Sequence, residues 1–277
     1  MTVPPVPYFG SKASVAAWIA DALPPHRHYV EPFAGGLSVL LAKTPSVMET
    51  VNDIDRELMT WWRVLRDRPA DLARVCALTP HSRAELDAAR EPAPPGGDLE
   101  TARRVWVRLT QGRGGTLRPT GWRHYVATSG SSTGMPGYLA GYVDRIAAAA
   151  ERLHHVSLEC QPAADLIARY GAAEDVLLYV DPPYLGSTRT AAARYRHEMR
   201  GEADHRDLAV QLHACRAAVV LSGYDSPLYA ELYDGWHRAE RPATTGNGGA
   251  SRGRTEVLWS NRPLQQTAQP DLFAAHA

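Results

Sequence analysis

An acid, two prolines and a tyrosine follow an apolar run of strand length, in the order Asp181, Pro182, Pro183 and Tyr184. The run itself, DVLLYV at residues 175–180, is typical of a central parallel strand. Ligands of open α/β sheets lie at the carboxyl ends of the strands, so we expect Asp181 to face that crevice. Because proline has no N–H, the Asp181 carboxylate and the Pro182 carbonyl should remain available as acceptors.

Two acceptors beside an aromatic ring suit a planar heterocycle that carries an amino group. The acceptors would bind the two amine hydrogens, and the Tyr184 ring would stack on the base. Hydrogen bonds from both N–H groups favour an sp³ nitrogen, which can attack a sulfonium methyl group without a covalent enzyme intermediate. A base inside a duplex must be flipped out to reach such a pocket.

A glycine turn, EPFAGGLS, lies where an earlier strand passes into a helix. The turn matches neither the dinucleotide-binding nor the Walker pattern, so its ligand is expected to lack phosphates. The next strand ends in Asn52, Asp53, Ile54 and Asp55. A carboxylate at this place can bind ribose hydroxyls, and we assign that role to Asp53, with Asp55 capping the next helix. A nucleoside without phosphates points to S-adenosylmethionine.

The elements around these motifs alternate between helix and strand periods, which predicts an α/β fold with parallel crossovers. Ser11 is expected to cap a helix over 11–23, and a late strand over 255–261 is expected to be antiparallel. Residues 67–155 contain few strand signals and are expected to form an insert of helices and flexible loops. They contain a stretch from Thr101 to Val143 with six arginines and no acid, which suggests a polyanion site.

Length and composition exclude several classes of protein. The chain has 277 residues, no net charge and a mean hydropathy of -0.32. No apolar run is long enough for a membrane span, and the N-terminus does not resemble a signal peptide. Three scattered cysteines, Cys76, Cys160 and Cys215, form neither a disulfide framework nor a metal-binding spacing. A reducing cytoplasm fits best.

The motifs PYFGSK, EPFAGG, NDID, DPPY and TTGNGGASRGRTEVLWSN occur in this order, with a variable segment before DPPY. In this the sequence resembles the Dam-type (D12 class) DNA adenine-N6 methyltransferases of the alpha group, over most of the chain outside the variable segment. The resemblance implies a Rossmann-like class I S-adenosylmethionine-dependent methyltransferase that ends in an antiparallel hairpin, acts on double-stranded DNA and is encoded by a bacterium or phage. It implies a catalytic domain of residues 1–66 and 156–263, a target-recognition region inserted at 67–155 and a flexible tail at 264–277.

The resemblance also implies site residues. The catalytic residues are Asp181, Pro182, Pro183 and Tyr184. The cofactor-binding residues are Tyr8, Lys12, Glu31, Phe33, Ala34, Gly35, Asp53 and Asp181. In the inserted region we expect arginine contacts with phosphates or guanine edges and a tryptophan that wedges or stacks, from Arg113, Arg118, Trp122 and Arg123.

One position departs from the family pattern. Members usually carry an acid near the cofactor's adenine, after the strand that precedes DPPY, and here Pro162 takes that place. Gln161 or Asp165 is the expected substitute. Near the C-terminus, Gln269–Phe273 (QPDLF) resembles the peptide by which bacterial proteins dock on the sliding clamp, with Leu272 and Phe273 as apolar anchors.

Other activities compete with adenine methylation of DNA. Cytosine-N4 methylation uses the same amine chemistry, usually with serine at the position of Asp181. Cytosine-C5 methylation is disfavoured, because it needs a Pro-Cys nucleophile and Cys160 is followed by Gln161. RNA adenine methylation and a catalytically silent DNA-binding module on the same scaffold stay open.

Overall fold

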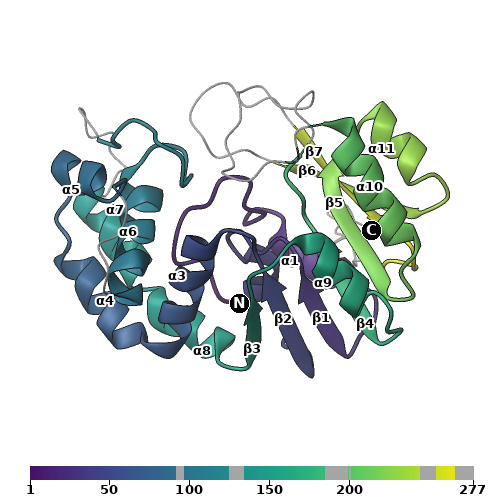
Figure 1. The fold of residues 1–277 in the computed structure, drawn as a ribbon, viewed down its shortest axis with the longest axis horizontal. Helices are drawn as coiled ribbons and strands as arrows, with labels where there is room; N and C mark the ends of the chain where they lie inside the picture. Colours follow the sequence, from purple (N-terminus) through teal and green to yellow (C-terminus); the bar gives the residue numbers. More distant parts are fainter. Residues whose placement is uncertain (92–96, 125–133, 185–198, 200, 244–253, 266–277) are drawn as a thin grey trace, which may run out of the picture.

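The computed structural model describes residues 1–91, 97–124, 134–184, 199, 201–243 and 254–265. Its centre is a seven-stranded sheet in the order β3-β2-β1-β4-β5-β7-β6 (Figure 1). Neighbouring strands from β3 to β5 are parallel, and β7 is antiparallel to both β5 and β6. The strands are β1 (His28–Glu31), β2 (Met48–Asn52), β3 (Val156–Glu159), β4 (Val176–Val180), β5 (Ala218–Tyr224), β6 (His237–Ala243) and β7 (Arg254–Ser260). The predicted α/β fold is confirmed, as is the late antiparallel strand.

Helices cover both faces of the sheet, which is why the central strands are apolar on both sides. All five residues of β4 are buried. Tyr29 and Tyr179 pack into the core on one face, and Val30 and Leu178 into the core on the other. The helices before β3 are α1 (Ala16–Ala22), α2 (Ser38–Ala42), α3 (Arg56–Asp67), α4 (Pro69–Leu78), α5 (Arg83–Ala88), α6 (Asp98–Gln111), α7 (Gly134–Val143) and α8 (Ile146–Leu153). Those after β3 are α9 (Ala163–Tyr170), α10 (Glu202–His213) and α11 (Pro227–Leu232).

The two predicted helix caps have different outcomes. Asp55 caps α3 as expected, since its side chain accepts hydrogen bonds from the backbone N–H groups of Glu57 and Leu58 at 3.0 and 3.2 Å. The prediction for Ser11 was wrong, because α1 begins at Ala16. The Ser11 hydroxyl instead lies 2.5 Å from that of Ser38, so it joins the N-terminal segment to α2.

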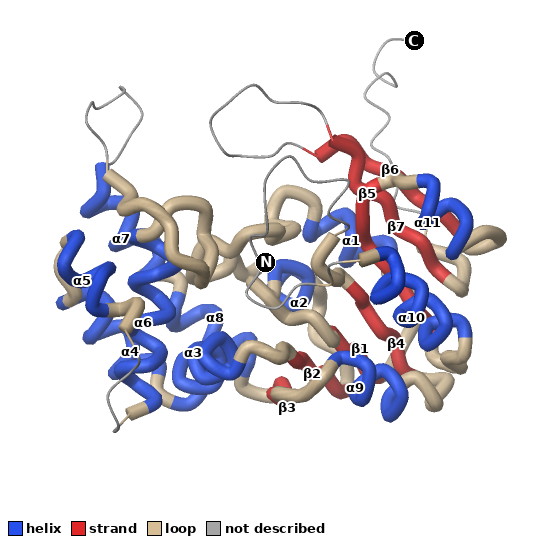
Figure 2. Tube along the Cα trace, turned by 45° about the horizontal axis from the view of Figure 1, so that its top comes forward, coloured by secondary structure: helices blue, strands red, loops and turns tan. Residues whose placement is uncertain are grey.

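Between β2 and β3 the described chain is helical, in agreement with the expectation for residues 67–155. Helices α4 to α7 gather at one end of the molecule, away from β4 and β5, in both views (Figures 1 and 2). Helix α6 packs on α3, and the Arg108 guanidinium bonds to the Glu57 carboxylate at 2.8 Å across that contact. No helix in the described part of the chain is long and apolar enough to cross a membrane.

The arginine block of this region does not form one basic surface. Arg103 is paired with Glu85 and Glu100 at 2.7 Å, and Arg104 with Glu100 at 2.8 Å. Together with Arg108, three of the six arginines therefore serve in ion pairs inside the helical region. These acids lie outside the acid-free stretch: Glu100 directly precedes it, whereas Glu57 and Glu85 reach the arginines only through the fold.

Candidate active site

A cavity of about 690 Å³ lies at the carboxyl ends of β1, β2 and β4. Its wall contains all eight residues that the resemblance assigned to the cofactor, together with Pro183: Tyr8, Lys12, Glu31, Phe33, Ala34, Gly35, Asp53 and Asp181. Pro182 and Tyr184 are buried and do not belong to this wall. These residues come from four separate segments of the chain, which meet at the place that the topology predicts for a ligand.

The glycine turn after β1 is held in one conformation by its neighbours. Gly35 has a φ of +46°, and a Cβ there would lie 3.0 Å from the Tyr8 ring. Its N–H donates to the Asp53 carboxylate at 3.1 Å, and its carbonyl accepts from the Trp62 indole N–H at 3.1 Å. The absence of a side chain thus lets Tyr8 close over the backbone.

Asp53 is oriented from both sides. One carboxylate oxygen accepts from the Gly35 N–H, and the other accepts from the Asp55 N–H at 2.9 Å. These two bonds fix the direction of the Asp53 carboxylate at the end of β2.

Asp181 follows β4 directly and lies within a dense polar cluster. The Lys12 ammonium donates to its two carboxylate oxygens at 2.8 and 2.7 Å, and the Ser222 hydroxyl donates to one of them at 3.1 Å. Ser222 is in turn 3.0 Å from the Tyr179 hydroxyl. The carboxylate is therefore fixed by donors from two other parts of the chain.

Tyr184 is held by a residue that the sequence reasoning missed. Its hydroxyl donates to the buried Glu256 carboxylate of β7 at 2.7 Å, and its ring packs edge-on with Tyr224 at 4.6 Å between centroids. Burial raises the pKa of Glu256, and the negative charge of Asp181 adds to this effect. The sequence did contain a signal, because Glu256 is an acid on the same side of an apolar strand as Leu258.

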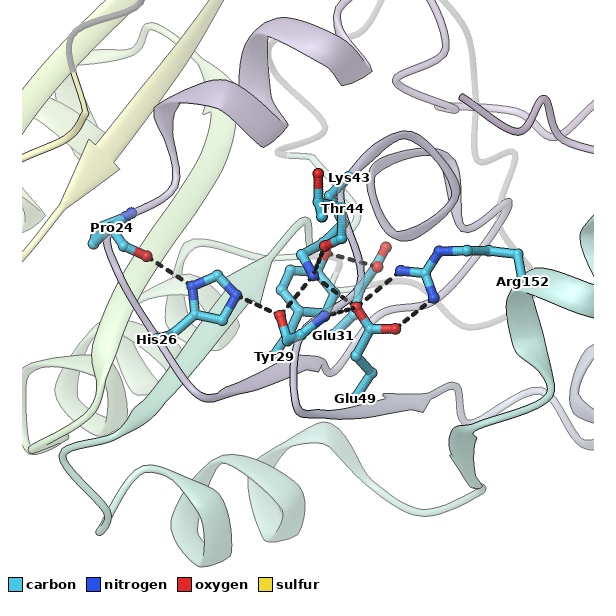
Figure 3. A network of polar contacts seen from close by, with 9 residues as sticks. Pro24, His26, Tyr29, Glu31, Lys43, Thr44, Glu49 and Arg152 are labelled. Carbon is cyan, nitrogen blue, oxygen red and sulfur yellow. Dashed lines mark hydrogen bonds and ion pairs between the residues drawn. The ribbon is translucent and has the colours of Figure 1, made fainter.

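Glu31, the last residue of β1, lines the cavity. It is 3% exposed and accepts a hydrogen bond from the Tyr29 hydroxyl at 2.9 Å (Figure 3). Burial raises the pKa of Glu31 to about 8, against the opposing effect of the Tyr29 bond. The group is thus largely protonated at neutral pH, and Asp181 is spared a second full negative charge beside it.

Neither residue expected to replace the family's usual acid lines the described wall. Pro162 itself lines the cavity just before α9, whereas the side chains of Gln161 and Asp165 do not. Gln161 serves through its backbone, whose N–H and C=O bond the Asn52 side chain at 2.9 and 3.0 Å. The wall there is lined by Pro162 and Ala163, which offer apolar contact instead.

The expected DNA-contacting residues lie in the loop after α6. Trp122 stacks with His81 and His124 at 4.5 and 5.3 Å between ring centroids, so stacking on a base would require these rings to move. The Arg123 guanidinium lies 4.8 Å over the Tyr138 ring. DNA contacts by Arg113, Arg118, Trp122 and Arg123 stay a prediction, and the clamp-like segment Gln269–Phe273 lies outside the described residues.

Comparison with known proteins agrees with this geometry. The family model of the D12 class N6 adenine-specific DNA methyltransferases matches residues 8–90 and 143–245. A curated relative, the Type II methyltransferase M1.LlaDCHI of Lactococcus lactis subsp. cremoris, is 28% identical over 272 residues, which cover 91% of this chain and 93% of the relative.

Two solved structures are more distant. A precorrin 8W decarboxylase of Methanobacterium thermoautotrophicum has 9% identity and a TM-score of 0.40, with 95% of this chain and 96% of that chain covered. The rRNA methyltransferase aviRa of Streptomyces viridochromogenes has 13% identity and a TM-score of 0.41, with 94% and 88% covered.

The strand order, the cavity at the strand ends and the DPPY turn define a Rossmann-like methyltransferase. More narrowly, the chain belongs to the D12 class N6 adenine-specific DNA methyltransferases. The predicted family and enzyme class are thereby confirmed.

Proposed function

We propose that this enzyme transfers the methyl group of S-adenosylmethionine to the N6 amine of an adenine that has been flipped out of duplex DNA. The observation that carries the proposal is the position of the Asp181 carboxylate, which opens into the same cavity as the Gly35 turn and Asp53. One cavity thus combines an amine acceptor with a nucleoside site.

The cavity residues fit this cofactor. Asp53 would accept the ribose hydroxyls at the end of β2, and the Gly35 turn would hold the methionine part close to the backbone. Pro162 and Phe33 supply apolar contact for an adenine ring. S-adenosylmethionine supplies an electrophilic methyl group on its sulfonium when bound.

The protein's own contribution is to orient and polarise the target amine. The Asp181 carboxylate accepts one N6 hydrogen, and the rigid Pro182–Pro183 turn keeps that carboxylate at the end of β4. Positive charge builds up on the amine nitrogen during the transfer, and the anionic Asp181 stabilises that positive charge. No covalent enzyme intermediate is needed.

The Lactococcus relative is a Type II methyltransferase, which supports a modification role beside a restriction endonuclease. In this reading the inserted region at 67–155 recognises the target sequence, through the loop that carries Arg113, Arg118, Trp122 and Arg123. The clamp contact through Gln269–Phe273 is a separate proposal, tested by retention of the sliding clamp on the tail peptide and its loss when Leu272 and Phe273 are replaced by alanine.

The proposed reaction is tested by incubating unmethylated duplex DNA with S-adenosylmethionine labelled in its methyl group. The DNA is then digested to nucleosides and analysed by mass spectrometry. Labelled N6-methyldeoxyadenosine is the expected product. N4-methyldeoxycytidine would overturn the target base, and a product on structured RNA alone would overturn the polymer.

A further inference from the structure

We propose that Lys12 is a positioning residue for Asp181: its ammonium group holds the carboxylate aimed at the target amine, and it does not bind the cofactor. This inference deepens the proposed function and rests on it. It changes the role that the family resemblance implied for Lys12.

The hydrogen bonds of Lys12 leave no donor for a cofactor. An ammonium group has three N–H bonds. The Lys12 Nζ atom donates to Oδ1 and Oδ2 of Asp181 at 2.8 and 2.7 Å, and to the Gly10 carbonyl at 3.0 Å. The Lys12 side chain is 6% exposed, so water does not compete for these bonds.

The charges around Asp181 require a cation at this point. Two further acids, Glu31 and Glu256, are buried nearby, and the charge of Asp181 helps to raise the pKa of each. The titratable and polar groups that face Asp181 are Lys12 before α1, Glu31 on β1, Tyr179 on β4, Tyr184 after β4, Ser222 on β5, Tyr229 on α11 and Glu256 on β7. Among these groups Lys12 is the cation, and its charge opposes the rise in the pKa of Glu256.

The same contacts fix the direction of the carboxylate. Oδ1 receives both the Lys12 ammonium and the Ser222 hydroxyl, whereas Oδ2 receives the ammonium alone among the measured bonds. A lone pair of Oδ2 therefore remains for an incoming N–H. Lys12 also lies 4.6 Å over the Tyr184 ring, so it sits where the carboxylate and the ring meet.

The test compares Lys12→Met with Lys12→Arg in the full chain. Single-turnover methyl transfer to DNA is measured at saturating cofactor and DNA at pH 7, and S-adenosylmethionine binding is measured by calorimetry. We expect Lys12→Met to lower the rate about 100-fold, because the carboxylate loses the two bonds that hold its direction. Lys12→Arg keeps a donor and should retain at least about a tenth of the wild-type rate, and the cofactor Kd should change less than about threefold in both variants.

A cofactor Kd raised tenfold or more in Lys12→Met, with a single-turnover rate within about threefold of wild type, would overturn the proposal and restore a cofactor-binding role. A double-mutant cycle with Asp181→Asn, read from urea unfolding without cofactor or DNA, tests the pairing independently of methylation. Non-additive stabilities are expected, and additive ones would contradict the pairing. Absence of methylation by the wild-type protein would instead overturn the proposed function and leave this cycle interpretable. If Lys12→Met does not fold, Lys12→Gln takes its place in both measurements.

Discussion

At the scale of single residues, the site depends on side chains that bond to the DPPY turn and hold it in place. Tyr184 is fixed through its hydroxyl by Glu256, so the ring orientation depends on an acceptor at position 256. We expect Glu256→Leu to reduce kcat about 10- to 100-fold at an unchanged cofactor Kd, because the ring loses its anchor. Glu256→Gln keeps an acceptor and should stay within about threefold of wild type.

Steady-state kinetics of the two variants check this prediction. Tyr184→Phe provides the internal comparison, since it removes the other partner of the same hydrogen bond. If Glu256→Leu impairs an enzyme that already carries Tyr184→Phe as strongly as it impairs wild type, the anchoring role of Glu256 is wrong.

Glu31 gives a prediction for the pH dependence of stability. Its pKa is raised to about 8 in the folded protein, so folding favours the protonated form. The stability that this group contributes is complete below its unfolded pKa and is lost as the pH rises towards about 8. Glu31→Gln cannot ionise, and we expect it to exceed wild type by roughly 1–4 kcal/mol at pH 9, with little difference at pH 4.5.

Urea unfolding of the cofactor-free protein at the two pH values measures this difference. A gap between wild type and Glu31→Gln that is the same at pH 4.5 and pH 9 would mean that Glu31 does not titrate in this range.

At the scale of elements, the loop after α6 supports the segment that presents Tyr8 and Lys12. The Phe9 N–H donates to the Gly115 carbonyl at 2.7 Å. Gly115 has a φ of +61°, and a Cβ there would lie 3.1 Å from the Pro7 carbonyl oxygen. Gly115→Ala should destabilise the protein by about 1–2 kcal/mol and lower methyl transfer, because both the left-handed backbone and the Pro7 contact are disturbed.

Gly141→Ala is the matched control for this substitution, since a Cβ at Gly141 meets no atom within 4 Å. Thermal unfolding and single-turnover rates are compared for the two variants. Equal effects of the two substitutions would show that the loop does not support the N-terminal segment.

Sequence reasoning predicted the elements around the motifs because their signals are local. The apolar run before Asp181 and the cap at Asp55 depend on neighbouring residues in the chain, and both are found where expected. Ser222 and Glu256 were missed because their partners lie 41 and 72 residues away, and only the sheet order brings them together. The Arg108–Glu57 pair escaped prediction for the same reason, since its partners lie 51 residues apart.

At the scale of the whole molecule, a buried ion cluster joins the helical region to the catalytic sheet. Glu49 on β2 bonds both Lys43 at 2.6 Å and Arg152 of α8 (Figure 3). The Lys43 and Glu49 side chains are 5% and 4% exposed and that of Arg152 is 10%. Arg152→Met leaves Glu49 with Lys43 as its ionic partner and should cost about 2–4 kcal/mol of unfolding free energy.

Arg216→Met is the control, because the Arg216–Glu174 pair lies on the surface and should contribute nothing measurable. Both variants are compared by urea unfolding. A loss in Arg152→Met no larger than that in Arg216→Met would show that the buried cluster does not stabilise the junction.

The central claim is that the Asp181 carboxylate acts on the target amine and not on the cofactor. The most direct measurement is single-turnover methyl transfer to duplex DNA by Asp181→Asn, with calorimetric S-adenosylmethionine binding on the same preparation. We expect a rate lowered by about 10³-fold or more with a cofactor Kd within about threefold of wild type. A variant that methylates adenine within tenfold of the wild-type rate, or that loses activity only through weakened cofactor binding, would contradict it.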